Sequence, residues 1–455
     1  MPSPLSADAR EQLCHLSRPA HAVTARLCEE VDDACLDAEQ VLLYSADAAS
    51  QAERLYRLLS AADLFDLRRP LLPRAHRTVL AAAPREPYDY IPLAINAQLA
   101  LRSHANVSGN RFARRRLQPA GRPAAAAGVG LLFITAWSNA WQETAHRALP
   151  HVFEAWCHER GGVTVVPAMW GATAPRHSAA ADAASARTWL GAFSAAEVWT
   201  LGLMPTPEPV QQQLFGNRPC DAACLGAYAA ASDAFFAARG ARCFGRLRVC
   251  NFQQTPAAAR PWSAMQALAA YHAGMPANAT LAPRLSAEEG TVRVLFVVRA
   301  TRRRVENLDE LVGACARWRP RARADAPRVE CAARGLGAGV KSVVPLLRAA
   351  DVLFGVHGGD LINGLMLHAG ASVVEVLPLK RAGCPCETFK RVFASEPGKV
   401  FHYVAKSDNM SFLRGRNRGM HSDMVVPVEV VERALERVIH VQGDPRKYRF
   451  HEIRY

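Results

Sequence analysis

Short apolar runs alternate with segments of helical spacing through the second half of the chain. Short buried runs separated by amphipathic helices are typical of a parallel sheet whose crossovers are right-handed. The pattern predicts a Rossmann-like α/β domain over residues 290–430, followed by a C-terminal helix or tail at 431–455. The expected strands and helices fall at residues 292–299, 307–318, 329–332, 341–350, 352–356, 361–367 and 372–377.

The first half carries the same alternation less clearly. Apolar runs there predict strands at residues 129–134, 163–166, 198–203 and 246–251, with a helix at 141–158. We expect a second Rossmann-like domain over 126–280, and a region of helices and irregular structure over 1–125 that leads into it. A segment rich in Pro, Asn, Ser and Gly at 276–289 separates the two domains. The predicted fold class is therefore α/β, with two Rossmann-like domains that face a cleft.

Composition narrows the class of protein. The chain has 455 residues, half of them apolar, which suits a globular protein of two or three domains rather than a disordered one. We expect no membrane span, because no apolar run reaches about 18 residues, and no signal segment is visible in the first residues. The net charge of +14 comes almost entirely from arginines spread along the chain. That spread argues against a nucleic-acid partner, and leaves the cluster at 114–116 as a solvated loop or a contact for an acidic partner.

The twelve cysteines show no zinc-binding spacing, so buried thiols and disulfides both remain open. N-glycosylation sequons at Asn106, Asn278 and Asn409 favour a secretory compartment. No D-x-D motif follows an expected strand of the first domain, which argues for chemistry without a metal.

The most informative segment is a His-Gly-Gly turn, His357 to Gly359, directly after the strand at 352–356. Glycine lets a backbone approach a phosphate closely, and the first N–H groups of a helix favour an anion. A tight strand-to-helix turn that needs glycine for geometry alone remains an equal alternative.

Arg299 and Arg303 follow the strand at 292–299 and would lie at the same edge of the sheet. Guanidinium groups there suit a diphosphate through bidentate hydrogen bonds. For the neighbouring Arg302 and Arg304 we favour a solvated basic turn. Glu375 could bind ribose hydroxyls, or it could simply cap a helix or join a salt bridge.

Three motifs, in order and correctly spaced, resemble glycosyltransferase family 61 over about residues 292–390. They are R-x-x-x-R-x-x-x-N-x-x-E-L, D-V-L-x-G-V-H-G-G-D-L-x-N and G-A-x-V-V-E-V-x-P. The residues that match are Arg299, Arg303, Asn307, Glu310, His357, Gly358, Gly359, Leu361, Asn363, Glu375 and Pro378.

The resemblance implies two domains in the GT-B arrangement and inversion at the anomeric carbon. It implies a UDP-linked nucleotide-sugar donor, a glycan or glycoprotein acceptor, a pentose or GlcNAc-type sugar, no cofactor and residence in the Golgi or endoplasmic reticulum. The donor would be held by Arg299, Arg303, Asn307, Glu310, His357, Gly358, Gly359, Asn363 and Glu375.

The first half resembles the family more faintly, around the segment at 139–150. Gln142 stands where relatives carry His, and His146 where they carry Asp. Since glutamine cannot take a proton, the general base would be Glu143 or His146. Otherwise the chain is a degenerate member that binds a glycan or a partner. An NAD-dependent oxidoreductase is disfavoured, because no G-x-G-x-x-G follows an early strand.

Overall fold

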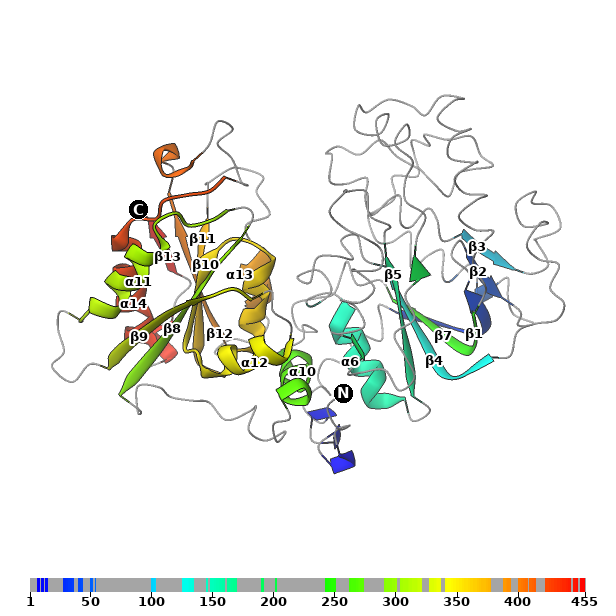
Figure 1. The fold of residues 1–455 in the computed structure, drawn as a ribbon. Coiled ribbons are helices and arrows are strands. Elements are labelled where there is room, and N and C mark those ends of the chain that lie inside the picture. The colour runs from blue at the N-terminus through cyan, green and yellow to red at the C-terminus, as the bar shows by residue number, and fades with distance from the viewer. Residues whose placement is uncertain are drawn as a thin grey trace, which may run out of the picture. The chain divides into compact units, whose positions relative to one another are not determined.

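The structure, a computed structural model, describes about half of the chain. The described residues are 6–8, 10–11, 13–14, 28–36, 40–43, 50–51, 54, 100–103, 125–134, 145, 148–159, 162–169, 190–191, 201–202, 242–250, 262–273, 290–300, 303–320, 327–336, 340–377, 388–393, 400–407, 409–414, 422–442, 445–448 and 451–454. The chain divides into two compact units (Figure 1). The C-terminal unit comprises Arg260–Tyr455 with Met1–Leu16, and the N-terminal unit comprises Ser17–Ala259.

Six strands of the C-terminal unit form one parallel sheet, in the order β13-β12-β11-β10-β8-β9. They are β8 (Thr291–Val297), β9 (Arg328–Arg334), β10 (Val352–Val356), β11 (Ala371–Leu377), β12 (Val400–Lys406) and β13 (His451–Arg454). The strand that follows β8 in the chain lies on one side of it, and β10 lies on the other side. The order in which the chain adds strands to the sheet therefore reverses between β8 and β10. Doubly wound sheets bind ligands at such a switch point, beyond the carboxyl ends of the strands.

Helices cover both faces of this sheet (Figure 1). On one face α11 packs against α14, and on the other α12, α13 and α10 pack with the 3-10 helix η8. Alternate strand residues such as Val294, Phe296, Phe354 and Val374 form a core beneath α11 and α14, as the two-residue period of a strand requires. The helices are α10 (Trp262–Ala273), α11 (Leu308–Arg317), α12 (Val340–Ala349), η8 (Gly359–Met366), α13 (Thr388–Phe393), η9 (Met410–Phe412), α14 (Val428–Gln442) and η10 (Pro445–Lys447).

The N-terminal unit contains a seven-stranded mixed sheet, in the order β3-β2-β1-β7-β4-β5-β6. Strand β1 runs antiparallel to both of its neighbours, β2 and β7, whereas the other pairs are parallel. Helix α6 (Leu149–His158) packs against β5. The strands are β1 (Cys28–Leu36), β2 (Gln40–Leu43), β3 (Ala100–Ser103), β4 (Ala125–Ile134), β5 (Val163–Met169), β6 (Leu201–Gly202) and β7 (Arg242–Cys250).

The expectation of helices and irregular structure before residue 125 is wrong for β1, β2 and β3. The acidic sequence of β1 gives little strand propensity, but its carboxylates meet cations across the sheet. Glu30 accepts hydrogen bonds from Arg246 at 3.1 Å and from Arg248 at 2.9 Å, both on β7. A disulfide joins Cys28 to Cys250 at the end of the same strand pair. Partners 216 or more residues away therefore stabilise this strand.

The α/β class and the parallel sheet of the second half are confirmed, since every strand and helix expected between residues 292 and 377 is present. The helix after the His-Gly-Gly turn is a 3-10 helix, and two strands, β12 and β13, were not expected. The domain limits and the cleft between the domains stay predictions. Among the described helices, none has the length and apolar character to cross a membrane.

Candidate functional site

The candidate site is built around the turn that ends β10, at the switch point of the parallel sheet. His357 is hydrogen-bonded through its backbone N–H to β11 at 2.9 Å, and Gly358 precedes η8. The N–H of Leu361 makes the first hydrogen bond of that helix, to Gly358 O at 3.0 Å. The side-chain amide of Asn363 donates to Asp360 O at 2.9 Å. The backbone N–H groups before Leu361 have no acceptor within a 3-10 helix, which makes the turn suitable for an anion.

Arg299, two residues beyond β8, lies over this turn. Its Nη1 donates to Asp360 Oδ2 at 2.8 Å, and its side chain is 21% exposed. A Cβ atom at Gly358 would lie 3.0 Å from Arg299 Cζ and still closer to Nη1. Only glycine therefore leaves room for the guanidinium at this position.

Arg303 reaches the same turn from the other end of the segment after β8. Its Nη1 donates to the carbonyl oxygen of His357. Its backbone has φ of 55°, in the left-handed region that a residue with a side chain rarely adopts. A non-glycine residue keeps such a conformation only where surrounding contacts hold it, and such residues cluster at functional sites. Both guanidinium groups expected to bind an anion thus converge on the expected glycine turn.

Asn307 and Glu310 lie at the start of α11, where their side chains bond to each other and Asn307 also bonds to the backbone of Val426. The Asn307 side chain donates to Val426 O at 2.8 Å and accepts from Val426 N at 3.0 Å, and it also donates to Glu310 at 3.0 Å. This pairing attaches the segment at 422–427 to α11. The contact of these two residues with a donor stays a prediction.

Arg304 points to a different partner from Arg299 and Arg303. Its guanidinium donates to Asp423 at 2.6 Å and 2.9 Å. The hydrogen bond from Arg304 lowers the pKa of the Asp423 carboxyl. The expectation that Arg304 lies in an exposed turn is confirmed, with an ion pair added; Arg302 lies outside the described residues.

Glu375 lies within β11 rather than at its end, and its side chain is 0% exposed. One carboxylate oxygen accepts from Nδ1 of His357, and the other accepts from Nε2 of His402 at 2.8 Å. Burial alone would raise the pKa of the Glu375 carboxyl, but the hydrogen bonds and charges of both histidines lower it below its ordinary value. The direct ribose contact expected for Glu375 does not fit this placement, because both oxygens already accept bonds within the core.

His402, on β12, is the site residue that sequence reasoning missed. It is a single histidine within the apolar run of β12 and is 2% exposed. A polar residue in such a run must find a partner in the core. That signal predicts a buried partner without saying which strand supplies it.

The expected catalytic residues, Glu143 and His146, lie outside the described residues, as does Gln142. The choice of general base therefore stays a prediction.

In the described part of the chain, one group of possible metal ligands lies close together, namely Cys28, His151 and Cys250. The two cysteines are bonded to each other, so neither offers the thiolate that a metal needs. Burial, with the nearby charge of Arg248, lowers the pKa of His151 to about 4. This group is a disulfide packed against a neutral histidine.

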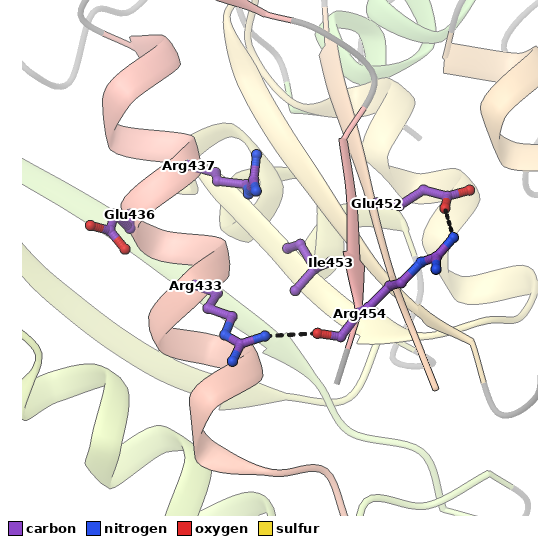
Figure 2. A pocket seen from close by; sticks show the side chains of 6 residues that line it. All are labelled: Arg433, Glu436, Arg437, Glu452, Ile453 and Arg454. Atoms are coloured by element: carbon purple, nitrogen blue, oxygen red, sulfur yellow. Dashed lines mark hydrogen bonds and ion pairs between the residues drawn. The ribbon is translucent and has the colours of Figure 1, made fainter. Parts of the chain in front are cut away.

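A pocket of about 260 Å³ lies between α14 and the edge strand β13, and Figure 2 shows the side chains that line it. Arg433 donates to the carbonyl oxygen of Arg454 at 2.8 Å, and Arg454 lies 3.9 Å from Glu452 (Figure 2). Glu436 and Arg437 complete the charged lining. The pocket lies at the edge of the sheet, three strands from β10 in the sheet order, and is separate from the candidate site.

Comparison with known proteins gives one partial similarity. The chain is 35% identical over 89 residues to beta-1,2-xylosyltransferase XYXT1 of Oryza sativa subsp. japonica. The similarity covers 20% of this chain and 17% of the xylosyltransferase, so the chain matches about a sixth of that relative's length. No protein-family model matches the chain. The partial similarity supports a relationship to glycosyltransferases.

Proposed function

We propose that this chain is an inverting glycosyltransferase of the GT-B arrangement. It moves a sugar of the pentose or GlcNAc type from a UDP-linked donor to a hydroxyl of a glycan or glycoprotein. The observation that carries the proposal is the convergence of Arg299 and Arg303 on the glycine turn at the switch point of the sheet. The partial similarity to a plant xylosyltransferase supports the same class of reaction.

The reaction is a single in-line displacement. The acceptor hydroxyl attacks the anomeric carbon, the bond to the diphosphate breaks, and its electron pair stays on the leaving diphosphate. Negative charge grows on that group, so fixed cations beside it lower the barrier. Arg299 and Arg303 supply those cations without a metal, and Glu143 or His146 takes the acceptor's proton. Turnover is therefore expected to be unchanged in excess EDTA, and abolished turnover would refute the metal-free mechanism.

The expected compartment is the lumen of the Golgi or endoplasmic reticulum. No cysteine within the described residues is free, and disulfides persist in oxidising compartments. The sequon at Asn409 is exposed, as glycosylation requires. A mobility shift on enzymatic deglycosylation that is lost in Asn409→Gln would support this location.

Thermal unfolding against a panel of nucleotide sugars tests the donor proposal. A ligand present at 100 times its Kd stabilises a protein by about 2.7 kcal/mol, which raises Tm by a few degrees. We expect UDP-linked donors to raise the Tm of the wild type, and Arg299→Ala and Arg303→Ala to lose the shift. Arg437→Ala, in the separate pocket, is the matched control and should keep it. No shift with any nucleotide sugar, or an equal shift in all variants, would refute the donor site.

Gln142, in place of the family's histidine, favours a second candidate function. In this alternative the chain is a degenerate relative that binds a glycan or a partner and does not turn over donor. Transfer activity that appears only in Gln142→His would support the alternative, whereas activity of the wild type would exclude it.

A further inference from the structure

Three neighbouring strands place a carboxylate between two imidazoles inside the C-terminal unit. Glu375 of β11 is 0% exposed, His402 of β12 is 2% exposed, and His357 at the end of β10 is 8% exposed. Each oxygen of Glu375 accepts a bond from a different histidine. A buried carboxylate is costly unless it is paired on both oxygens, and the two histidines supply those partners here.

The carboxylate determines which nitrogen of His357 carries a proton. An ionised carboxylate only accepts hydrogen bonds, so Nδ1 of His357 must carry the hydrogen. The Nε2 atom is then the nitrogen at which His357 gains or loses a proton. A carboxylate at Nδ1 orients the ring and stabilises the imidazolium, as acidic residues do for histidines in metal and protease sites.

The surroundings of His357 place it on the side of the leaving group. Its carbonyl oxygen accepts from Arg303, and the next residue, Gly358, lies beneath Arg299. In an in-line displacement the attacking hydroxyl approaches from the side opposite the diphosphate. With a diphosphate held at the glycine turn, His357 would therefore lie beside the leaving group and on the side opposite the acceptor.

Charged groups face His357 from several elements. Glu375 of β11 and Asp360 of η8 carry negative charge, and Arg299 and Arg303 after β8 carry positive charge. His402 on β12 shares the charge of Glu375. From α13 the facing residue is Phe389, whose ring centroid lies 5.4 Å from that of His357 in an edge contact.

We propose that Glu375 is a positioning residue that holds His357 with Nδ1 inward, so that protonated His357 donates from Nε2 to the diphosphate of the donor. This inference rests on the proposed donor site and adds a third cation to it. No proton is transferred to the diphosphate, and His357 remains an imidazolium while the bond to the sugar breaks. The carboxylate acts through His357 and does not touch the donor.

Nitrogen NMR of the full chain labelled at histidine tests the inference without any donor. His357→Gln identifies the signals of His357. We expect the neutral ring to carry its hydrogen on Nδ1 in the wild type, and to titrate at Nε2. In Glu375→Gln the preference for Nδ1 should weaken, because an amide can also donate. A wild-type ring with its hydrogen on Nε2 would overturn the inference even if Glu375→Gln fails to fold.

Binding of UDP-xylose between pH 5.5 and 8 provides the second measurement, because its diphosphate stays fully ionised over that range. We expect the wild type to bind more tightly as the pH falls through the range in which an imidazole gains a proton. Glu375→Gln should bind about tenfold more weakly at pH 6, as expected for the loss of one charge-assisted hydrogen bond, and should lose most of this dependence. His357→Gln should lose it altogether.

Asp351→Asn is the matched control. Asp351 is also a buried carboxylate that accepts from a histidine, His368, at 2.9 Å. It directly precedes β10, whereas His357 directly follows that strand, so the two pairs lie at opposite ends of β10. The control should keep the pH dependence of binding. Equal losses in Asp351→Asn and Glu375→Gln would overturn the positioning role. A wild type that binds no nucleotide would refute the proposed function, while the NMR result would still decide the orientation of His357.

Discussion

Replacing Gly358 with alanine tests whether the glycine turn exists to seat Arg299. The added Cβ would lie 3.0 Å from Arg299 Cζ and 3.3 Å from Nη2, with Nη1 nearer still. These atoms are at the far end of a flexible side chain, so the guanidinium can swing away. The change therefore breaks the Arg299–Asp360 ion pair, whose side chains are 21% and 41% exposed. Such a partly exposed pair contributes about 0.2–1 kcal/mol, so the free energy of unfolding should fall by no more than about 1 kcal/mol.

The effect on donor binding should be much larger. A hydrogen bond between charged groups contributes about 1.5–3 kcal/mol, which corresponds to a loss of roughly 10- to 100-fold in affinity for UDP. Calorimetric titration of UDP gives the affinity, and urea unfolding gives the stability.

Gly364→Ala is the matched control, because it makes the same change within η8. Its Cβ would lie 2.5 Å from Val373 Cγ2 and 3.0 Å from the Phe393 ring, both in the core. Overpacking there should cost about 1–3 kcal/mol of stability and leave the affinity for UDP within about twofold of the wild type in the folded protein. In an Arg299→Ala background, Gly358→Ala should cause little further loss of affinity, because the two changes remove one interaction. Unaltered UDP binding in Gly358→Ala, or additive losses in the double variant, would refute the reasoning.

Three further predictions concern other parts of the chain. Glu143→Gln or His146→Asn, whichever removes the general base, should lower turnover by about 100-fold or more with unchanged UDP affinity; if neither lowers kcat, both assignments are wrong. The lowered pKa of Asp423 in the folded state stabilises the fold above the ordinary aspartate pKa of about 3.9, and this contribution is lost as the pH falls through the folded value. Acid unfolding of Asp423→Asn should therefore depend less on pH below about 4 than that of the wild type, and identical acid profiles would contradict the Arg304 contact. The Cys315–Cys331 disulfide closes a loop of 16 residues, so replacing both cysteines with alanine should lower the free energy of unfolding by about 3 kcal/mol, and urea unfolding that matches the wild type would contradict the bond.

The order of strands and helices between residues 292 and 377 follows from local pattern. Apolar runs such as the one that became β10 are short, continuous and bounded by polar or glycine residues, and such runs form buried parallel strands in most contexts. The sequence also marked the turn at His357 and the arginines after β8, because the ends of parallel strands are where a sheet can bind a ligand. The sequence did not predict β1, because its acidic residues are stabilised in the strand by Arg246 and Arg248, which lie far along the chain.

Contacts between distant residues were decided by tertiary structure alone. The order of the strands placed β10 beside β8, which brought Arg299 and Arg303 to a glycine turn about 55 residues later in the chain. The same packing took Glu375 into the core between two histidines, whereas the sequence left open a ribose ligand, a helix cap or a salt-bridged carboxylate. Local pattern determines which face of a strand is apolar, because that depends on neighbours two residues apart. The partner of a polar side chain depends on which strand lies beside it, and that is settled only when the whole sheet has formed.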